Sequence, residues 1–237
     1  MLKSKGLNLL IVTKFILMLF VALTVSAAQS LPPQLPIYIT FQADEVGKFP
    51  PGWISRDGNN GLKIYAVEAE GEKKFLHADA RGVAEQVGTE HSWALKDLPV
   101  LQWQWRAILF PEGTNEREKH RNDSVLGIYV IFGHLPFISA IKYIWSDTLP
   151  VGTTFNSPLS NDTKIMVIRS GRALANTWLT EKRDVLFDYK QLFGEKEKNP
   201  VATGIGILTD SDNTNTHAIG DYGYIEVLGP HEEPPKP

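Results

Sequence analysis

The stretch Leu101-Gln102-Trp103-Gln104-Trp105-Arg106-Ala107-Ile108-Leu109 alternates apolar and polar residues. Successive side chains of a β-strand point to opposite faces, so this pattern predicts a strand with two different surfaces. One face carries Trp103 and Trp105, which we expect in a hydrophobic core because large aromatic side chains are usually buried. The opposite face carries Gln102, Gln104 and Arg106, a row of planar hydrogen-bonding groups.

Similar patterns recur on both sides of this strand. The 237 residues include 19 Gly, 15 Pro and 24 aromatic residues (6 Trp, 7 Tyr and 11 Phe), a mixture typical of short strands joined by tight turns. We predict ten strands, near residues 37–42, 62–69, 73–79, 99–109, 124–133, 141–147, 163–170, 176–187, 202–209 and 222–228. The expected fold is therefore all-β, a two-sheet antiparallel β-sandwich of the jelly-roll type. At most one short helical turn is expected, from a capping Asp188 to Phe193, ended by Gly194.

The first 28 residues have the pattern of a secretory signal peptide. Three lysines and no acid precede an apolar run from Phe15 to Val25, and the small residues Ser26-Ala27-Ala28 follow it. A membrane anchor is the alternative, but that run is about half of the roughly 20 residues that a bilayer span needs. We therefore expect a bacterial protein that is periplasmic or secreted. Residues 29–36 are then a Pro-rich linker, residues 37–229 a single β-sandwich domain and residues 230–237 a disordered tail.

Charge and composition exclude several classes of function. The formal net charge is −3, and removal of the three signal-peptide lysines makes it 21 − 27 = −6, which disfavours nucleic-acid binding. The chain has no cysteine, so disulfides and thiolate metal sites are ruled out. Its six histidines lack zinc-ligand spacing, and the sequence contains no Gly-x-Ser-x-Gly elbow, phosphate-binding loop or dinucleotide fingerprint. We expect no cofactor and no membrane span after cleavage, and we favour a role without catalysis.

The polar row on the first strand is the leading candidate for a ligand site. Amide and guanidinium groups match the vicinal hydroxyls of sugars, and a partly exposed tryptophan can stack on a pyranose ring. The candidate contact set, expected on one sheet, is Gln102, Gln104, Arg106, Trp145, Glu181 and Arg183. The alternatives are that the row simply faces water, that Trp145 packs in the core, and that Glu181 pairs with Arg106 or Arg169.

Two other functions remain open from the residues. A polysaccharide lyase or hydrolase could use Glu181 or Asp210 as a base, with Arg183 to neutralise a uronate. A glycosidase needs two carboxylates about 5–10 Å apart, and Glu181 and Asp184 point to opposite faces of their strand. The third possibility is a structural envelope protein that binds another protein through a sheet face or an edge strand.

The segment from Thr209 to Asn215 is the richest in oxygen donors. Asp210, Asp212 and Asn213 could ligate a hard cation such as Ca²⁺, although the spacing is not that of an EF-hand. The alternative is a turn in which these side chains bond to the backbone at the end of a strand.

Several blocks of the sequence, taken in order, resemble one bacterial family, and they include Trp103-Gln-Trp105-Arg106, Tyr143-Ile-Trp145-Ser146, Trp178-Leu-Thr-Glu181 and Thr209-Asp210-Ser-Asp212. The family is the domain of unknown function 3047, and the resemblance runs from about Phe41 to Val227. This family has no established activity, so the resemblance implies no catalytic residue. The opening of the domain, with Pro50-Pro51-Gly52-Trp53, and its closing strand are similar to those of carbohydrate-binding jelly rolls. The leading expectation is a glycan-binding module.

Overall fold

The computed structural model describes residues 34–56, 58 and 61–230. The predicted signal peptide, the first part of the expected linker and the tail beyond residue 230 lie outside the described residues, and those assignments stay predictions. Within the described part, no helix has both the length and the apolar character needed to cross a bilayer.

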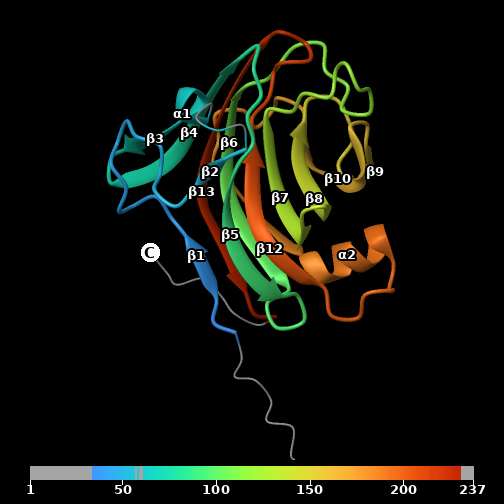
Figure 1. The fold of residues 1–237 in the computed structure, drawn as a ribbon. Coiled ribbons are helices and arrows are strands. Elements are labelled where there is room, and N and C mark those ends of the chain that lie inside the picture. Colours follow the sequence, from blue (N-terminus) through green and yellow to red (C-terminus); the bar gives the residue numbers. More distant parts are fainter. Residues whose placement is uncertain (1–33, 57, 59–60, 231–237) are drawn as a thin grey trace, which may run out of the picture. The chain divides into compact units, whose positions relative to one another are not determined.

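In the described residues, thirteen strands form two sheets that pack face to face (Figure 1). The six-stranded sheet has the order β11 (Leu179–Asp184), β6 (Val100–Leu109), β13 (His217–Leu228), β4 (Lys73–Arg81) and β3 (Tyr65–Glu70), with β1 (Ile37–Ile39) also paired to β13. The seven-stranded sheet has the order β2 (Ile54–Ser55), β5 (Val87–Ala94), β12 (Val201–Leu208), β7 (Leu126–His134), β8 (Phe137–Ser146), β10 (Ser160–Ser170) and β9 (Thr154–Ser157). From β5 onward the chain passes repeatedly between the sheets, so the expected jelly-roll sandwich is confirmed. One strand pair, β8 with β10, is parallel.

All ten expected strands are present, and three strands were missed. β2 and β9 are too short for a period-two pattern, and β5 (Val-Gly-Thr-Glu-His-Ser-Trp-Ala) is polar and contains a glycine. A short helix, α1 (Gly61–Ile64), stands where the strand near 62–69 was expected to begin.

The second helix begins earlier than expected. α2 covers Val185–Phe193, and its N-cap is Asp184, whose carboxylate accepts a hydrogen bond from the Phe187 amide at 2.8 Å. The expectation that Asp188 caps this helix was wrong, because Asp188 lies in the first turn and is buried. The helix does end at Gly194, whose φ of 82° suits a residue without Cβ.

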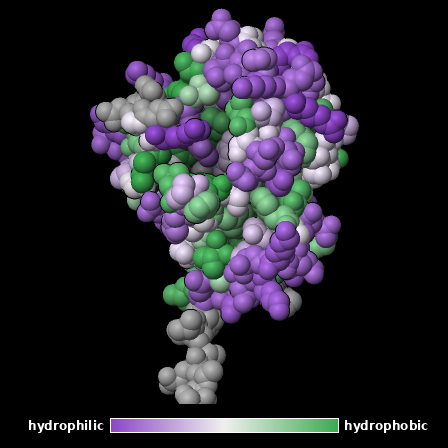
Figure 2. Space-filling view, turned by 45° about the vertical axis from the view of Figure 1, so that its right-hand side comes forward, coloured by the Kyte–Doolittle hydropathy of each residue, from purple (hydrophilic) through white to green (hydrophobic). Residues whose placement is uncertain are grey.

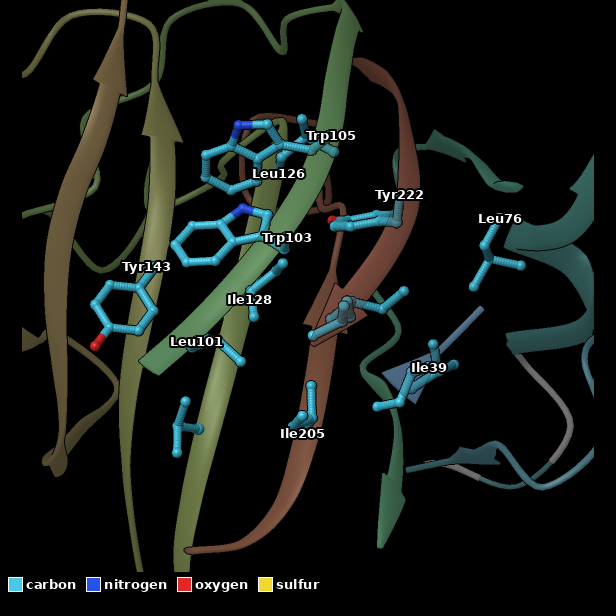
Figure 3. Packing of buried hydrophobic residues seen from close by; sticks show 14 of the residues in the cluster. Ile39, Leu76, Leu101, Trp103, Trp105, Leu126, Ile128, Tyr143, Ile205 and Tyr222 are labelled. Carbon is cyan, nitrogen blue, oxygen red and sulfur yellow. The ribbon is translucent and has the colours of Figure 1, made fainter. Parts of the chain in front are cut away.

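The two sheets enclose a core built around the tryptophans of β6. Trp103 and Trp105 are completely buried, as predicted. The Trp103 ring is stacked on Tyr143 of β8, with centroids 5.5 Å apart, and it meets Trp105 edge to face (Figure 3). Trp145 joins the same core with 1% of its surface exposed. The aromatic residues of β6 and β8 therefore hold the two layers together.

The outer face of the seven-stranded sheet is only partly covered. Over β8 and β10 a second apolar cluster of Ile144, Ile165 and Val167 packs against Leu149 and Phe155 from the β8–β10 connection. Over β5, β12 and β7 the face is hollowed instead.

Candidate functional site

The polar row of β6 lies on the outer face of the six-stranded sheet, but other protein groups already bind it. Gln102 is buried, and its amide donates to Glu226 at 3.2 Å and to the Tyr224 hydroxyl at 3.3 Å. The amide oxygen of Gln104 accepts a hydrogen bond from the Lys73 ammonium at 2.6 Å. The row therefore faces outward as the alternation predicts, with much of its hydrogen-bonding capacity used inside the protein.

Arg106 is also bound by other protein groups, two carboxylates and a tryptophan ring. Its guanidinium donates to Asp221 at 2.7 Å and to Glu70 at 3.0 Å. The ring of Trp178 lies over it, with the guanidinium carbon 4.6 Å from the ring centroid, and the Lys73 ammonium lies 3.4 Å from the same centroid. Burial, together with the nearby Arg106 charge, lowers the pKa of Lys73 to about 8.

The other three members of the predicted contact set do not join the polar row. One of them lies on the other sheet, so the expectation that all six residues share one sheet was wrong. Trp145 belongs to the seven-stranded sheet and is buried, and its indole nitrogen donates to the carbonyl of Gly171 at 3.0 Å. Glu181 and Arg183 are on β11, where the register pairs them with Trp103 and Leu101 of β6. Directly paired residues share a face, so both side chains point toward the other sheet, away from the polar row.

Glu181 and Arg183 are engaged in separate ion pairs. Glu181 receives two hydrogen bonds from Arg169 on β10, at 2.5 and 3.1 Å, and a third from the Trp105 indole at 3.2 Å. Arg183 donates twice to Asp188, which also accepts from the Tyr143 hydroxyl at 2.9 Å. The pairing of Glu181 with a neighbouring arginine, left open by the sequence, is therefore present. Whether any of the six residues binds a ligand stays a prediction.

The oxygen-rich segment after β12 forms a compact cluster. Carboxylate oxygens of Asp210, Asp212 and Asp123 lie within 4.8 Å of one another, and Asp123 was not foreseen from the sequence. Asp123, which lies outside this segment, accepts hydrogen bonds from the backbone amides of Asn213 and Thr214, at 3.1 and 2.8 Å.

Asp210 is the buried member of this cluster. It accepts from the Ser124 amide at 2.7 Å and lies 4.0 Å from the Lys142 ammonium. Burial raises the pKa of Asp210 to about 6, against the opposing effect of Lys142. Calcium at Asp210, Asp212 and Asn213 stays a prediction. Among the described residues, Asp210 shares no hydrogen bond or ion pair with Glu181 or Arg183, so the groups of the predicted enzyme site do not converge.

The hollow on the seven-stranded sheet is a trough of about 630 Å³. Its floor contains Gly88 of β5 with Gly204 and Gly206 of β12. Gly88 is paired directly with Gly206, and Gly204 with Glu90. Because these neighbouring positions lack side chains, the backbone itself forms the floor. We call this hollow the glycine trough.

The walls of the glycine trough mix polar and apolar side chains. Groups that can form hydrogen bonds come from Arg56, Gln86, Glu90, His91 and His134. Apolar side chains come from Ile54, Leu135 and Ile138, which are 59%, 85% and 40% exposed. The space-filling view shows hydrophobic residues grouped down the middle of this side of the molecule, bordered by hydrophilic ones (Figure 2). Burial lowers the pKa of His91, which favours its neutral form.

The sequence did not reveal this site because its main feature is an absence of side chains. The relevant signal was Gly204-Ile-Gly206 within an apolar strand, because glycine weakens a strand interior and often marks the close approach of a ligand or another backbone. Gly88 lies in β5, a strand that was not predicted, so the pairing of the glycines could not be seen.

Comparison with known proteins gives a family but no activity. The profile of the family described as "Protein of unknown function (DUF3047)" matches residues 53–226. No curated protein matches the sequence.

Several solved structures are similar to this chain at low sequence identity. A cellulase derived from Cel12A of Rhodothermus marinus is 11% identical, with 81% of this chain and 97% of that chain covered and a TM-score of 0.37. The xyloglucanase domain of NopAA from Sinorhizobium fredii, in complex with cellobiose, is 9% identical, with 83% and 97% covered and a TM-score of 0.38. The carbohydrate recognition domain of Emp47p is 10% identical, with 80% and 93% covered and a TM-score of 0.39. Similarities this weak assign neither a ligand nor a reaction to this chain.

Proposed function

The chain belongs to the DUF3047 family, and on that premise we propose that it is a glycan-binding protein whose binding site is the glycine trough. The observation that carries the proposal is the bare floor formed by Gly88, Gly204 and Gly206. Side chains on these strands would fill the hollow, and each glycine in a strand interior costs roughly 0.5–1 kcal/mol relative to alanine. A Cβ at Gly88 would lie 2.8 Å from the Ile205 carbonyl oxygen, and one at Gly204 would lie 3.1 Å from that of Thr89, so the close approach of the backbone already favours glycine at these two positions. At Gly206 a Cβ would meet mainly the side chain of Gln86, and a ligand that lies on the sheet gives this position a reason to be glycine.

The dimensions and chemistry of the trough suit an extended carbohydrate chain. Neighbouring strands lie about 4.8 Å apart, so a floor of two strands with walls on the next strands is roughly 10 Å wide, enough for one pyranose ring. Gln86, Glu90 and His134 supply donors and acceptors for hydroxyl groups, and Ile54 and Leu135 supply apolar surface for the C–H faces of the rings. Binding sites for small molecules commonly combine apolar walls with a few polar groups in this way.

The trough supports binding better than hydrolysis. Among the described residues that line it, Glu90 is the single carboxylate. Glycoside hydrolysis ordinarily uses two carboxyl groups on either side of the scissile bond. We therefore propose a role without catalysis at this site.

Affinity electrophoresis against a panel of envelope and plant polysaccharides tests the proposal. Gly206→Val places a branched side chain on the floor, where an added Cβ meets mainly the flexible end of Gln86, so the variant should fold. We expect it to lose retention. Gln104→Ala changes the polar row on the opposite sheet, and Thr180→Val is a control of similar size on the exposed side of β11. Both should keep retention.

Two results would contradict the proposal. Loss of retention in Gln104→Ala, with retention kept in Gly206→Val, would move the site to the polar row of β6. Failure of the wild-type protein to bind any glycan of the panel would exclude glycan binding. Near-ultraviolet circular dichroism of each variant shows whether it is folded.

A second candidate function is the binding of an envelope protein. The observation in its favour is the β7–β8 turn, where Leu135 and Phe137 are each 85% exposed on either side of Pro136. We expect a double variant, Leu135→Ser with Phe137→Ser, to reduce capture of a periplasmic partner while leaving the fold unchanged.

We also propose that the protein is exported. N-terminal sequencing of the protein from the periplasm or medium tests this proposal by locating cleavage after Ala27 or Ala28.

A further inference from the structure

One end of the glycine trough is formed by hydrogen-bond donors gathered around Gly206. The amide nitrogen of Gln86 lies 3.0 Å from the position that a Cβ of Gly206 would take, and the Cβ of Tyr129 lies 3.5 Å from it. The register places Gly88, Gly206, Tyr129 and Lys142 next to one another on four neighbouring strands. Gln86 and Tyr129 therefore stand on the two sides of the floor at this end.

Lys142 is paired with Tyr129 on the neighbouring strand. The Lys142 ammonium group lies 5.5 Å from the Tyr129 ring centroid. The hydroxyl group of Tyr129 carries one proton that it can donate. Burial raises the pKa of Tyr129, which keeps that proton in place. Lys142 itself is buried beside Asp210, at 4.0 Å.

Arg56 adds a positive charge to the same end. Its backbone amide donates to the Gln86 carbonyl at 3.0 Å, which fixes the two residues side by side, and its guanidinium acts electrostatically on Tyr129. Within the described part of the chain, the structure shows no ion pair to the exposed Arg56 side chain. The carboxylate of the trough, Glu90, is two positions farther along β5, beside Gly204. The trough thus has a donor-rich end and an end with an acceptor.

We propose that the donor-rich end, formed by Arg56 and Gln86, binds the carboxylate of a uronic acid residue, so that the ligand is an acidic glycan. This inference rests on the proposed function of the trough. A carboxylate offers two planar acceptor oxygens, which match a guanidinium fork supported by a side-chain amide. The chain carries a net charge of −3, so its overall field repels polyanions, and selection must come from these local contacts.

The test compares uronans with their neutral counterparts. Alginate and polygalacturonate, each alongside its carboxyl-reduced form, are used in affinity electrophoresis with the full exported chain. Hydrogen bonds to charged groups contribute about 1.5–3 kcal/mol, so we expect the wild-type protein to bind at least one uronan roughly tenfold or more tighter than its reduced form. Arg56→Gln and Gln86→Leu should reduce that ratio toward one. Lys182→Gln, which removes an exposed charge from the other sheet, should leave it unchanged.

The outcomes separate this inference from the proposed function. Equal binding of the uronans and their reduced forms, or binding of neutral glycans alone, overturns the carboxylate site and leaves glycan binding in place. A ratio that falls equally in Lys182→Gln and Arg56→Gln also overturns it, because net charge and not the local site would then decide. Absence of binding to every glycan, charged or neutral, overturns the proposed function itself.

Discussion

Replacing Glu181 with alanine distinguishes a structural carboxylate from one that binds a ligand. In the structure Glu181 accepts hydrogen bonds from Arg169 and from the Trp105 indole. The side chain of Arg169 is 37% exposed and regains water when its partner is removed, so we assign only about 1 kcal/mol to that ion pair. The Trp105 nitrogen is buried and is left without an acceptor, which costs about 1–3 kcal/mol.

These contributions predict that Glu181→Ala lowers the free energy of unfolding by about 2–4 kcal/mol. For a domain of this size that corresponds to a fall in Tm of roughly 4–16 °C. Glu181→Gln keeps an oxygen that can accept from Trp105, so its loss should be smaller. Lys182→Ala is the matched control, because Lys182 is on the same strand with its side chain exposed on the opposite face, and it should change stability by less than about 0.5 kcal/mol.

Urea unfolding followed by tryptophan fluorescence measures these differences, and glycan retention is measured on the same variants. We expect Glu181→Ala to keep its retention under conditions where it remains folded. A variant with wild-type stability and no retention would refute the reasoning, because it would show that Glu181 serves the ligand and not the fold.

Three further predictions concern the core and the buried polar groups. Burial raises the pKa of Glu116, with Ser146 and Lys142 offsetting it in part, so its stabilising contribution is complete below the unfolded pKa and is lost as pH rises through the folded pKa. Glu116→Gln should therefore gain stability relative to the wild type between pH 4 and pH 7 in urea titrations, and a constant difference would contradict this. Trp103→Ala should lose about 3–5 kcal/mol in the same assay, and a loss below about 1 kcal/mol would refute its place in the core. A calcium ion at the aspartate cluster should raise Tm by roughly 5–10 °C at a hundredfold excess over Kd, and Asp212→Asn should abolish the rise; an unchanged wild-type Tm counts against the ion.

The fold was predictable because alternation along one strand is a local signal. The pattern from Leu101 to Leu109 correctly separated the core tryptophans from the outward row, and β-branched and aromatic runs located the other long strands. Strand pairing is not local, however. The sequence placed Glu181 and Arg183 on one face, but only the register with β6 shows that this face points toward the other sheet.

The candidate site depended on contacts between distant segments, and these contacts left no local pattern. Trp178 covers Arg106 and Glu70 pairs with it, although neither is near Arg106 in the sequence. The glycine trough requires Gly88 to lie against Gly206, and Gly88 sits in a polar strand without regular alternation. Composition and periodicity indicate which face of a strand each side chain occupies, whereas this hollow forms where side chains are absent.

The glycine floor also implies a conflict between robustness and recognition in this protein. An alanine or valine at Gly206 would restrict the unfolded chain and suit the strand better, so such variants should withstand heating at least as well as the natural protein. Selection for thermal resistance alone would then drive the floor to fill, and under the proposed function the most durable descendants would be the ones that no longer bind.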